Sequence, residues 1–200
     1  MKPRILSICI FVGTMCVAQD ARRDPLRDRA QKEFVEGKFS AAERDFRELA
    51  RVYPADLQAH AYLGHALFRQ GKFADAIGPY EKVRELERDG KRLPDTEHRI
   101  LIDQLVMSYG MATELKKARQ LLDDAIHQDP DYPLNYYNLA CAYAEEGDKG
   151  KALASLELAF QRKANVLKGE QMPDPRSDSS FQKYMRDSDF VSLMKTLGYK

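Results

Sequence analysis

Residues 37–46, GKFSAAERDF, and residues 71–80, GKFADAIGPY, carry the same pattern 34 positions apart in the chain. The glycine, the lysine and the phenylalanine are identical, and an alanine and a second aromatic residue follow at the same distances. Further along the chain the same offset relates Leu105 to Leu139, Tyr109 to Tyr143 and Ala118 to Ala152. A fixed period of this length predicts a protein built from repeated units of one architecture.

One insertion interrupts this period. The offset from Ala76 to Ala118 is 42 residues rather than 34, and the residues over 88–98 include Asp-Gly and Leu-Pro-Asp, which are typical of a loop. We therefore expect four units, with the insertion between the second and the third. Their approximate bounds are 23–56, 57–90, 99–132 and 133–166.

Each unit is expected to form two helices. Asp56 is placed to cap a helix that runs to about Gln70, and Gly71 is placed to end it. A second helix is expected over about 74–88, where apolar residues recur at helical spacing. Because a pair of short helices cannot bury its apolar face alone, the repetition predicts an all-α fold in which successive pairs stack as a solenoid.

The repeated residues resemble the tetratricopeptide repeat family. The second unit matches its motif at His60, Leu63-Gly64, Leu67, Gly71, Ala76 and Tyr80, and the fourth at Tyr136, Leu139-Ala140, Tyr143, Gly147, Ala152 and Leu156. The third unit has Thr113 in place of a glycine, and the first has Arg29 and Glu33 where Leu and Tyr are expected. A terminal repeat has no preceding neighbour, which explains a polar outer face. The resemblance implies an α-solenoid of about four helix-turn-helix repeats over residues 19–166.

Residues 167–200 no longer follow the period. Pro173-Asp-Pro175 predicts a loop, and two short capping helices are expected after it. The first is expected over 181–187, capped by Asp178 or Ser179, and the second over 190–197, capped by Ser188 or Asp189. The residues expected to cover the open end of the last repeat are Phe181, Met185, Phe190, Leu193 and Leu197. This tail resembles the closing segment of many bacterial tetratricopeptide proteins.

The first eighteen residues predict a signal peptide. Two positive charges lie within Met1–Arg4, and an apolar run covers Ile5–Val17. Cys16-Val17-Ala18 then places small side chains where a signal peptidase needs them. The alternative, a transmembrane anchor, requires roughly 20 apolar residues, whereas this run has 13. We expect cleavage after Ala18, a mature chain that begins at Gln19, and a periplasmic or secreted location.

The composition argues against several functions. The chain has 32 Lys and Arg against 31 Asp and Glu, and a formal net charge of +1, so no overall charge directs it to nucleic acid or an anionic membrane. Cys141 is the only cysteine beyond residue 18, and no internal disulfide is expected. Its place in an apolar helix favours a half-buried structural residue over a nucleophile.

Sequence signatures of catalysis are not found. The chain has no glycine-rich phosphate loop, no His-Glu-x-x-His, no paired cysteine motif and no Gly-x-Ser-x-Gly. His60 and His65 are five positions apart and diverge by about 140° around a helix, so they are not expected to share a metal ion. We expect no catalytic residue, no metal site and no cofactor.

The resemblance implies that the first helix of each pair lines a concave face that contacts the ligand. The implied contact residues are Arg27, Gln31, Phe34, Tyr62, His65, Arg69, Gln104, Met107, Tyr137, Asn138 and Cys141. Tyrosine, arginine and methionine are enriched at protein interfaces. The family's clamp of Lys, Asn and Arg for a terminal carboxylate is mostly missing, because the corresponding positions hold Arg27, Gln31, Tyr62, Ile100 and Gln104.

Together these features predict an exported, non-catalytic scaffold that binds a partner protein or peptide through its concave face. It is expected to be a monomer or a weak homodimer, to bind no nucleic acid, and not to insert into the membrane once the leader is removed. Two alternatives stay open: a self-associating structural module, and an accessory subunit of an enzyme complex in the cell envelope.

Overall fold

The computed structural model describes residues 24–199 of the chain. The signal peptide predicted over 1–18 and the expected first mature residue, Gln19, lie outside the described residues. The described chain is all-helical and contains no strand, and it forms two compact units that divide between Arg92 and Leu93. Within residues 24–199 no helix is both long enough and apolar enough to cross a membrane.

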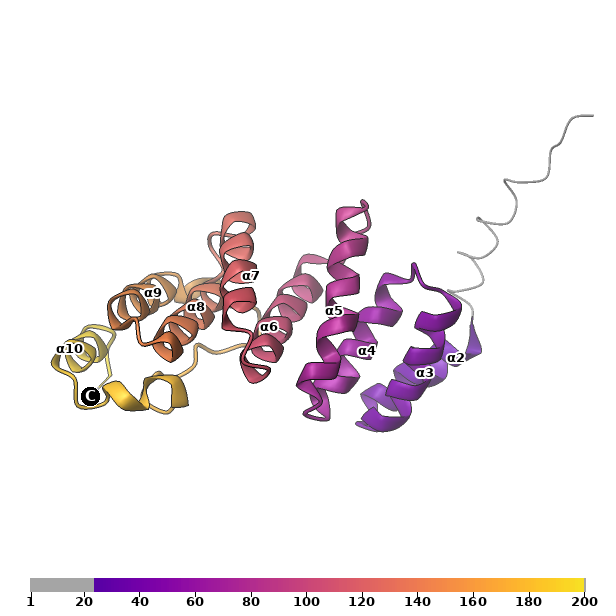
Figure 1. Cartoon of the computed structure of the whole chain (residues 1–200), viewed down its shortest axis with the longest axis horizontal. Helices are drawn as coiled ribbons and strands as arrows, with labels where there is room; N and C mark the ends of the chain where they lie inside the picture. Colours follow the sequence, from indigo (N-terminus) through magenta and orange to yellow (C-terminus); the bar gives the residue numbers. More distant parts are fainter. Residues whose placement is uncertain (1–23, 200) are drawn as a thin grey trace, which may run out of the picture. The chain divides into compact units, whose positions relative to one another are not determined.

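The first unit consists of two helical hairpins (Figure 1). Its helices are α2 (Pro25–Val35), α3 (Phe39–Val52), α4 (Leu57–Arg69) and α5 (Phe73–Arg88). The Asp56 carboxylate caps α4, as expected, by accepting a hydrogen bond from the Ala59 backbone N–H at 3.1 Å. Gly37 and Gly71 adopt φ values of +75° and +73° between the helices of their hairpins. The repeated glycine is therefore explained by the left-handed backbone of this turn, which other residues rarely adopt.

The second unit holds two further hairpins and a C-terminal segment. The hairpins are α6 (Asp95–Met111) with α7 (Leu115–Gln128), and α8 (Pro133–Glu146) with α9 (Lys149–Gln161). The loop expected over 88–98 is shorter than predicted, because α5 continues to Arg88 and α6 already begins at Asp95. Part of the insertion has thus become helix. Thr113 stands in the turn between α6 and α7 with a φ of +61°.

The α4–α5 and α8–α9 hairpins are each closed by a small residue on the first helix and a larger one on the second. In the first unit a Cβ atom on Gly64 would lie only 2.4 Å from the ring of Tyr80. Tyr80 itself is fully buried, so the ring has no room to withdraw. At the corresponding positions in the second unit Ala140 and Leu156 are also fully buried in one apolar cluster. In the second unit, therefore, an alanine replaces the glycine of the first helix, and the smaller Leu156 replaces the tyrosine of the second.

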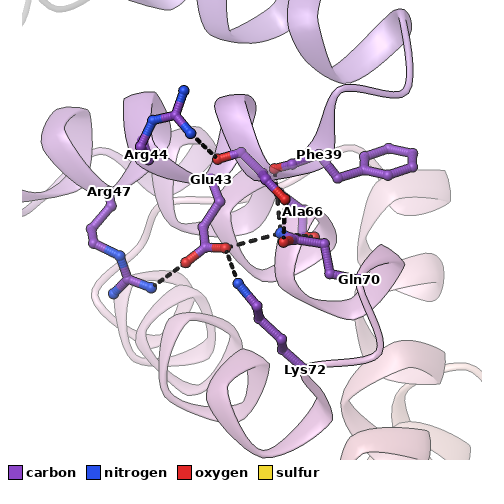
Figure 2. Close-up of polar contacts among 8 residues, drawn as sticks. Phe39, Glu43, Arg44, Arg47, Ala66, Gln70 and Lys72 are labelled. Carbon is purple, nitrogen blue, oxygen red and sulfur yellow. Dashed lines mark hydrogen bonds and ion pairs between the residues drawn. The ribbon is translucent and has the colours of Figure 1, made fainter.

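A half-buried carboxylate connects the two hairpins of the first unit (Figure 2). Glu43 of α3 accepts hydrogen bonds from Lys72 at 2.7 Å, and from Arg47 and Gln70 at 2.9 Å each. Burial raises the pKa of Glu43, but the hydrogen bonds from Lys72, Arg47 and Gln70 outweigh it and lower this pKa to about 2. Gln70 is held in turn by the Ala66 carbonyl oxygen at 2.9 Å.

The same junction in the second unit has the opposite polarity. Arg119 of α7 stands at the position of Glu43, and it donates to the Glu146 carboxylate at 2.8 Å. Burial lowers the pKa of Arg119, but the hydrogen bond and the charge of Glu146, together with Tyr143, outweigh this effect, so that the net shift is upward. The second helix of the hairpin thus contributes the acid, Glu43, in the first unit and the base, Arg119, in the second.

The C-terminal segment covers the end of the second unit with four of the five residues expected. It includes two 3-10 helices, η1 (Lys163–Asn165) and η2 (Ser179–Tyr184), and helix α10 (Ser188–Thr196). Phe181 and Phe190 are buried, as predicted, with their rings stacked at 6.0 Å. Leu193 and Leu197 are partly buried against the same cluster, whereas Met185 is exposed. Met194, which was not predicted, is also buried in the core.

The start of α10 also differs from the expectation. Asp187, rather than Ser188 or Asp189, caps this helix, because its carboxylate accepts from the backbone N–H groups of Asp189 and Phe190. The side chain of Lys149 bonds the same carboxylate at 2.8 Å. The cap of α10 is thereby tied to the first residue of α9.

Candidate functional site

Three of the predicted contact residues share one face of α4. Tyr62, His65 and Arg69 follow one another at intervals of three and four residues, which places them on one side of a helix. Tyr62 and His65 are half-buried, and Arg69 is exposed. The structure therefore brings these three residues together, and we refer to their side of the helix as the α4 face.

Aromatic packing holds the α4 face in place. The Tyr62 ring is stacked on Phe46 with centroids 5.1 Å apart, and Phe34 meets it edge-on at 5.4 Å. The Nδ1 atom of His65 lies 2.9 Å from the hydroxyl oxygen of the buried Tyr80. These contacts limit the rotamers of Tyr62 and His65 before any ligand arrives, which lowers the entropy cost of binding.

Arg69 offers a positive charge beside these rings. Its guanidinium carbon lies 4.5 Å from the centroid of Phe39, which in turn meets Phe34 edge-on at 5.4 Å. No carboxylate within residues 24–199 forms an ion pair with Arg69. An exposed guanidinium positioned over a ring keeps its N–H donors available for a carboxylate or a peptide carbonyl. Phe39 was not among the predicted contact residues, although its recurrence after Gly-Lys marked it in the sequence.

Arg27 was expected to be exposed, but it is buried. Only 8% of the residue is accessible, and its guanidinium pairs with the carboxylate of Asp56. Because Asp56 also caps α4, this ion pair fastens α2 to the start of the next hairpin. The expectation that Arg27 is an exposed contact residue is therefore wrong. Gln31, one turn further along α2, is half-buried.

In the second unit, the residues from α6 form no comparable cluster. Met107 is 46% exposed and Gln104 is half-buried. Asn138 of α8 donates a hydrogen bond of 2.6 Å to the Asp103 carboxylate. Burial raises the pKa of Asp103, while the bond from Asn138 opposes this effect. The amide of Asn138 is thus engaged within the unit.

Tyr137 and Cys141 lie beneath the C-terminal segment. Tyr137 is 2% exposed, and its hydroxyl donates to the Asp178 carboxylate at 3.0 Å. The Cys141 sulfur lies 3.7 Å from the same carboxylate. The expectation that Tyr137 is an open contact residue is wrong, because residues about forty positions later in the chain cover it. No sequence pattern near Tyr137 predicts its contact with Asp178.

The environment of Cys141 keeps its thiol protonated. Burial raises the pKa of the Cys141 thiol, and the negative charge of Asp178 adds to this effect. A thiol in such surroundings is a poor nucleophile. In the part of the chain that the structure describes, no three His, Cys, Asp or Glu side chains are grouped so that they could hold a metal ion.

A shallow hollow of about 400 Å³ lies elsewhere, along α5. It is lined by Gly78, Glu81, Lys82, Arg84, Glu85 and Arg88. All six residues belong to one helix, which would contact a ligand on one side only. The hollow includes none of the predicted contact residues, and the α4 face is the stronger candidate.

Comparisons with known proteins agree with this architecture. Two sequence models described as tetratricopeptide repeat match the chain, one over residues 27–89 and the other over residues 121–154. The chain belongs to the tetratricopeptide repeat family. The comparison with curated protein sequences gave no match.

Solved structures share the fold at low sequence identity. A crystal structure of the MamA protein has a TM-score of 0.68 and 22% identity, over 90% of this chain and 91% of MamA. MamA from Desulfovibrio magneticus RS-1 has a TM-score of 0.64 and 19% identity, over 88% and 90% of the two chains. YrrB, described as a TPR protein with an unusual peptide-binding site, has a TM-score of 0.63 and 12% identity, over 93% and 90%. At these identities the likeness establishes the fold alone.

Proposed function

We propose that this chain is a non-catalytic scaffold that binds an extended segment of a partner protein on the α4 face. The observation that carries the proposal is the exposed guanidinium of Arg69, positioned over Phe39 beside the packed ring of Tyr62. Membership of the tetratricopeptide repeat family supports it, and so does the peptide-binding site named for the structurally similar YrrB.

The residue types on this face suit a peptide ligand. Tyr62 offers an apolar ring with a polar tip, which is the amphipathic character common at protein interfaces. Arg69 provides N–H donors in a fixed plane for a carboxylate or for backbone carbonyl oxygens. Because both side chains are held by neighbouring rings, little of their motion is lost on binding.

The proposal is tested by identifying the partner and then substituting residues of the α4 face. Affinity capture with the wild-type chain identifies the partner, and its binding to purified variants is measured by calorimetry. We expect Tyr62→Ala combined with Arg69→Ala to weaken binding at least about tenfold, or roughly 1.4 kcal/mol. Arg51→Ala is the matched control, because Arg51 lies on α3 and pairs with Glu48. Equal loss in the control and the double variant would reject the α4 face.

We also propose that the protein acts outside the cytoplasm. The support is the positively charged start, the apolar run and the small residues before position 19 of the sequence. Mass spectrometry of the protein from its natural host is expected to find a first residue at Gln19. A chain that retains Met1 would contradict both the cleavage and the location.

A further inference from the structure

Each unit carries a cluster of charged side chains at the junction of its two hairpins. In the first unit the cluster surrounds Glu43, which accepts hydrogen bonds from Arg47 and from Lys72 (Figure 2). Arg44, the next residue of α3, is exposed, and its guanidinium bonds the Ser40 carbonyl oxygen at 3.3 Å. Arg44 forms no ion pair within residues 24–199. Its positive charge is therefore not neutralised by the part of the chain that the structure describes.

The second unit repeats these positions with the opposite charges. An offset of 76 residues carries Glu43 to Arg119 and Arg47 to Asp123. Asp123 is exposed, and it forms no ion pair within the described residues 24–199. Over the six corresponding positions of the two junctions, the other charged residues are Arg44, Lys72 and Asp75 in the first unit and Glu146, Asp148 and Lys151 in the second. The first junction thus has three cations and two carboxylates, whereas the second has two cations and three carboxylates.

The packing of the hairpins does not require this reversal. One ion pair connects the helices at each junction: Lys72 donates to Glu43 at 2.7 Å in the first unit, and Arg119 donates to Glu146 at 2.8 Å in the second. An ion pair of either orientation holds two hairpins together. The two exposed residues described above take no part in these pairs. Their charges therefore remain for a contact with another molecule.

The complementary charge for each junction is found on a second copy of the chain. The guanidinium of an arginine offers a carboxylate two parallel N–H donors, which suits Arg44 and Arg47 to aspartate or glutamate. Asp123 presents such a carboxylate on the surface of the other unit. A nucleic acid or an anionic membrane would instead require a continuous positive surface, and here Glu43 and Asp75 interrupt it.

We propose that the protein self-associates through these two junctions, so that the Arg44 side of one copy contacts the Asp123 side of another. Because each copy carries both surfaces, two copies exchange the contact reciprocally, as in a two-fold dimer. Charge complementarity sets the orientation of such a contact. Exposed ion pairs each contribute little, so the dimer is expected to be weak and to dissociate at high salt. The inference goes beyond the proposed function, since it uses no residue of the α4 face.

Sedimentation equilibrium of the purified wild-type protein tests the self-association. At an ionic strength of about 20 mM the Debye length is on the order of 20 Å, and at about 500 mM it is about 4 Å. We therefore expect the dissociation constant of the dimer to rise at least about tenfold between these two conditions. A protein that stays monomeric in both, or a dimer that is equally stable in both, would overturn the proposal.

Two variants of opposite sign test the contact itself. Arg44→Asp makes both junctions acidic, and Asp123→Arg makes both basic. Each variant alone is expected to weaken self-association at least about tenfold, because like charges then face each other. An equimolar mixture restores opposite charges at every contact, and it is expected to associate within about threefold of the wild type. Such recovery also shows that both variants are folded. A mixture as weak as its components would reject the contact.

Matched controls separate the two junctions from the overall charge. Arg51→Asp makes the same change on α3, where Arg51 donates two hydrogen bonds to Glu48 at 2.7 and 2.8 Å. Glu157→Arg makes the opposite change at an exposed position of α9. Both are expected to leave the dissociation constant unchanged, and losses as large as in the two junction variants would reject the proposal. The double variant at Tyr62 and Arg69 is expected to keep the self-association, so a failure of the α4 face is recognised separately.

Discussion

Helices α4 and α8 hold the same place in their hairpins, but they present different surfaces. On α4, Tyr62 and His65 are half-buried and Arg69 is exposed. On α8, Tyr137 is buried and Cys141 faces the Asp178 carboxylate. The repeat pattern is the same in both helices, because it describes the residues that close the hairpin. Which surface stays accessible depends on residues outside the pattern and on the segment that follows the last hairpin.

The largest expected difference between the two helices concerns their tyrosines. Tyr137→Ala is expected to reduce the free energy of unfolding by about 3 kcal/mol, because it empties a buried site and leaves Asp178 without its hydroxyl donor. Tyr62→Ala is expected to cost about 1–2 kcal/mol, since this ring is half-buried. Urea denaturation of both variants measures the two losses. Equal losses would mean that the C-terminal segment does not cover α8.

The second comparison concerns the closing pair of each hairpin. Gly64→Ala is expected to destabilise the protein by about 2 kcal/mol, because the added methyl group collides with the ring of Tyr80. In the second unit the same position already holds Ala140 against a core with Leu156. Combining Gly64→Ala with Tyr80→Leu is expected to recover part of the loss in thermal melting. A single variant as stable as the wild type would show that the hairpin can open without cost.

The third comparison uses the opposite polarity of the two junctions. The pKa of Glu43 is about 2 in the folded protein against an ordinary value of 4.5. Its contribution to stability is therefore complete above about pH 5, and is lost as the pH falls through 4.5 towards 2. Glu43→Gln is expected to remove about 1–2 kcal/mol at neutral pH, with allowance for solvent screening, and less at pH 3.

Urea denaturation at pH 7, 4 and 3 checks this prediction. Glu157→Gln, an exposed change on α9, serves as the control and is expected to follow the wild type at every pH. A Glu43→Gln variant that loses as much stability at pH 3 as at pH 7 would contradict the assigned hydrogen bonds.

The smallest expected effect is a gain in stability. Thr113 adopts the left-handed backbone that Gly37, Gly71 and Gly147 adopt in the other hairpin turns, and a β-branched residue is strained there. Thr113→Gly is expected to stabilise the protein by about 0.5–1 kcal/mol, since the greater freedom of glycine in the unfolded chain offsets part of the relief. Thermal melting measures the gain, and Thr96→Gly, in the first turn of α6, is expected to lower stability instead. A lower melting temperature for Thr113→Gly would mean that the turn is not strained.

The helical hairpins follow from the sequence because their determinants are local. The glycine turns, the Asp56 cap and the recurrence of small and large residues act within one repeat or between adjacent repeats, so a pattern of 34 residues reports them. Tyr62, His65 and Arg69 could be placed on one helix face for the same reason, since helical spacing alone determines it.

The exposure of the other predicted contact residues was decided by the tertiary structure. Arg27 is buried by an ion pair with Asp56, and Tyr137 by Asp178 and Phe181, which follow it by about forty residues. The repeat period carries no information about these contacts, because neither Asp178 nor Phe181 belongs to a repeat. Sequence spacing tells which side of a helix a residue occupies, whereas only the folded chain shows what else reaches that side.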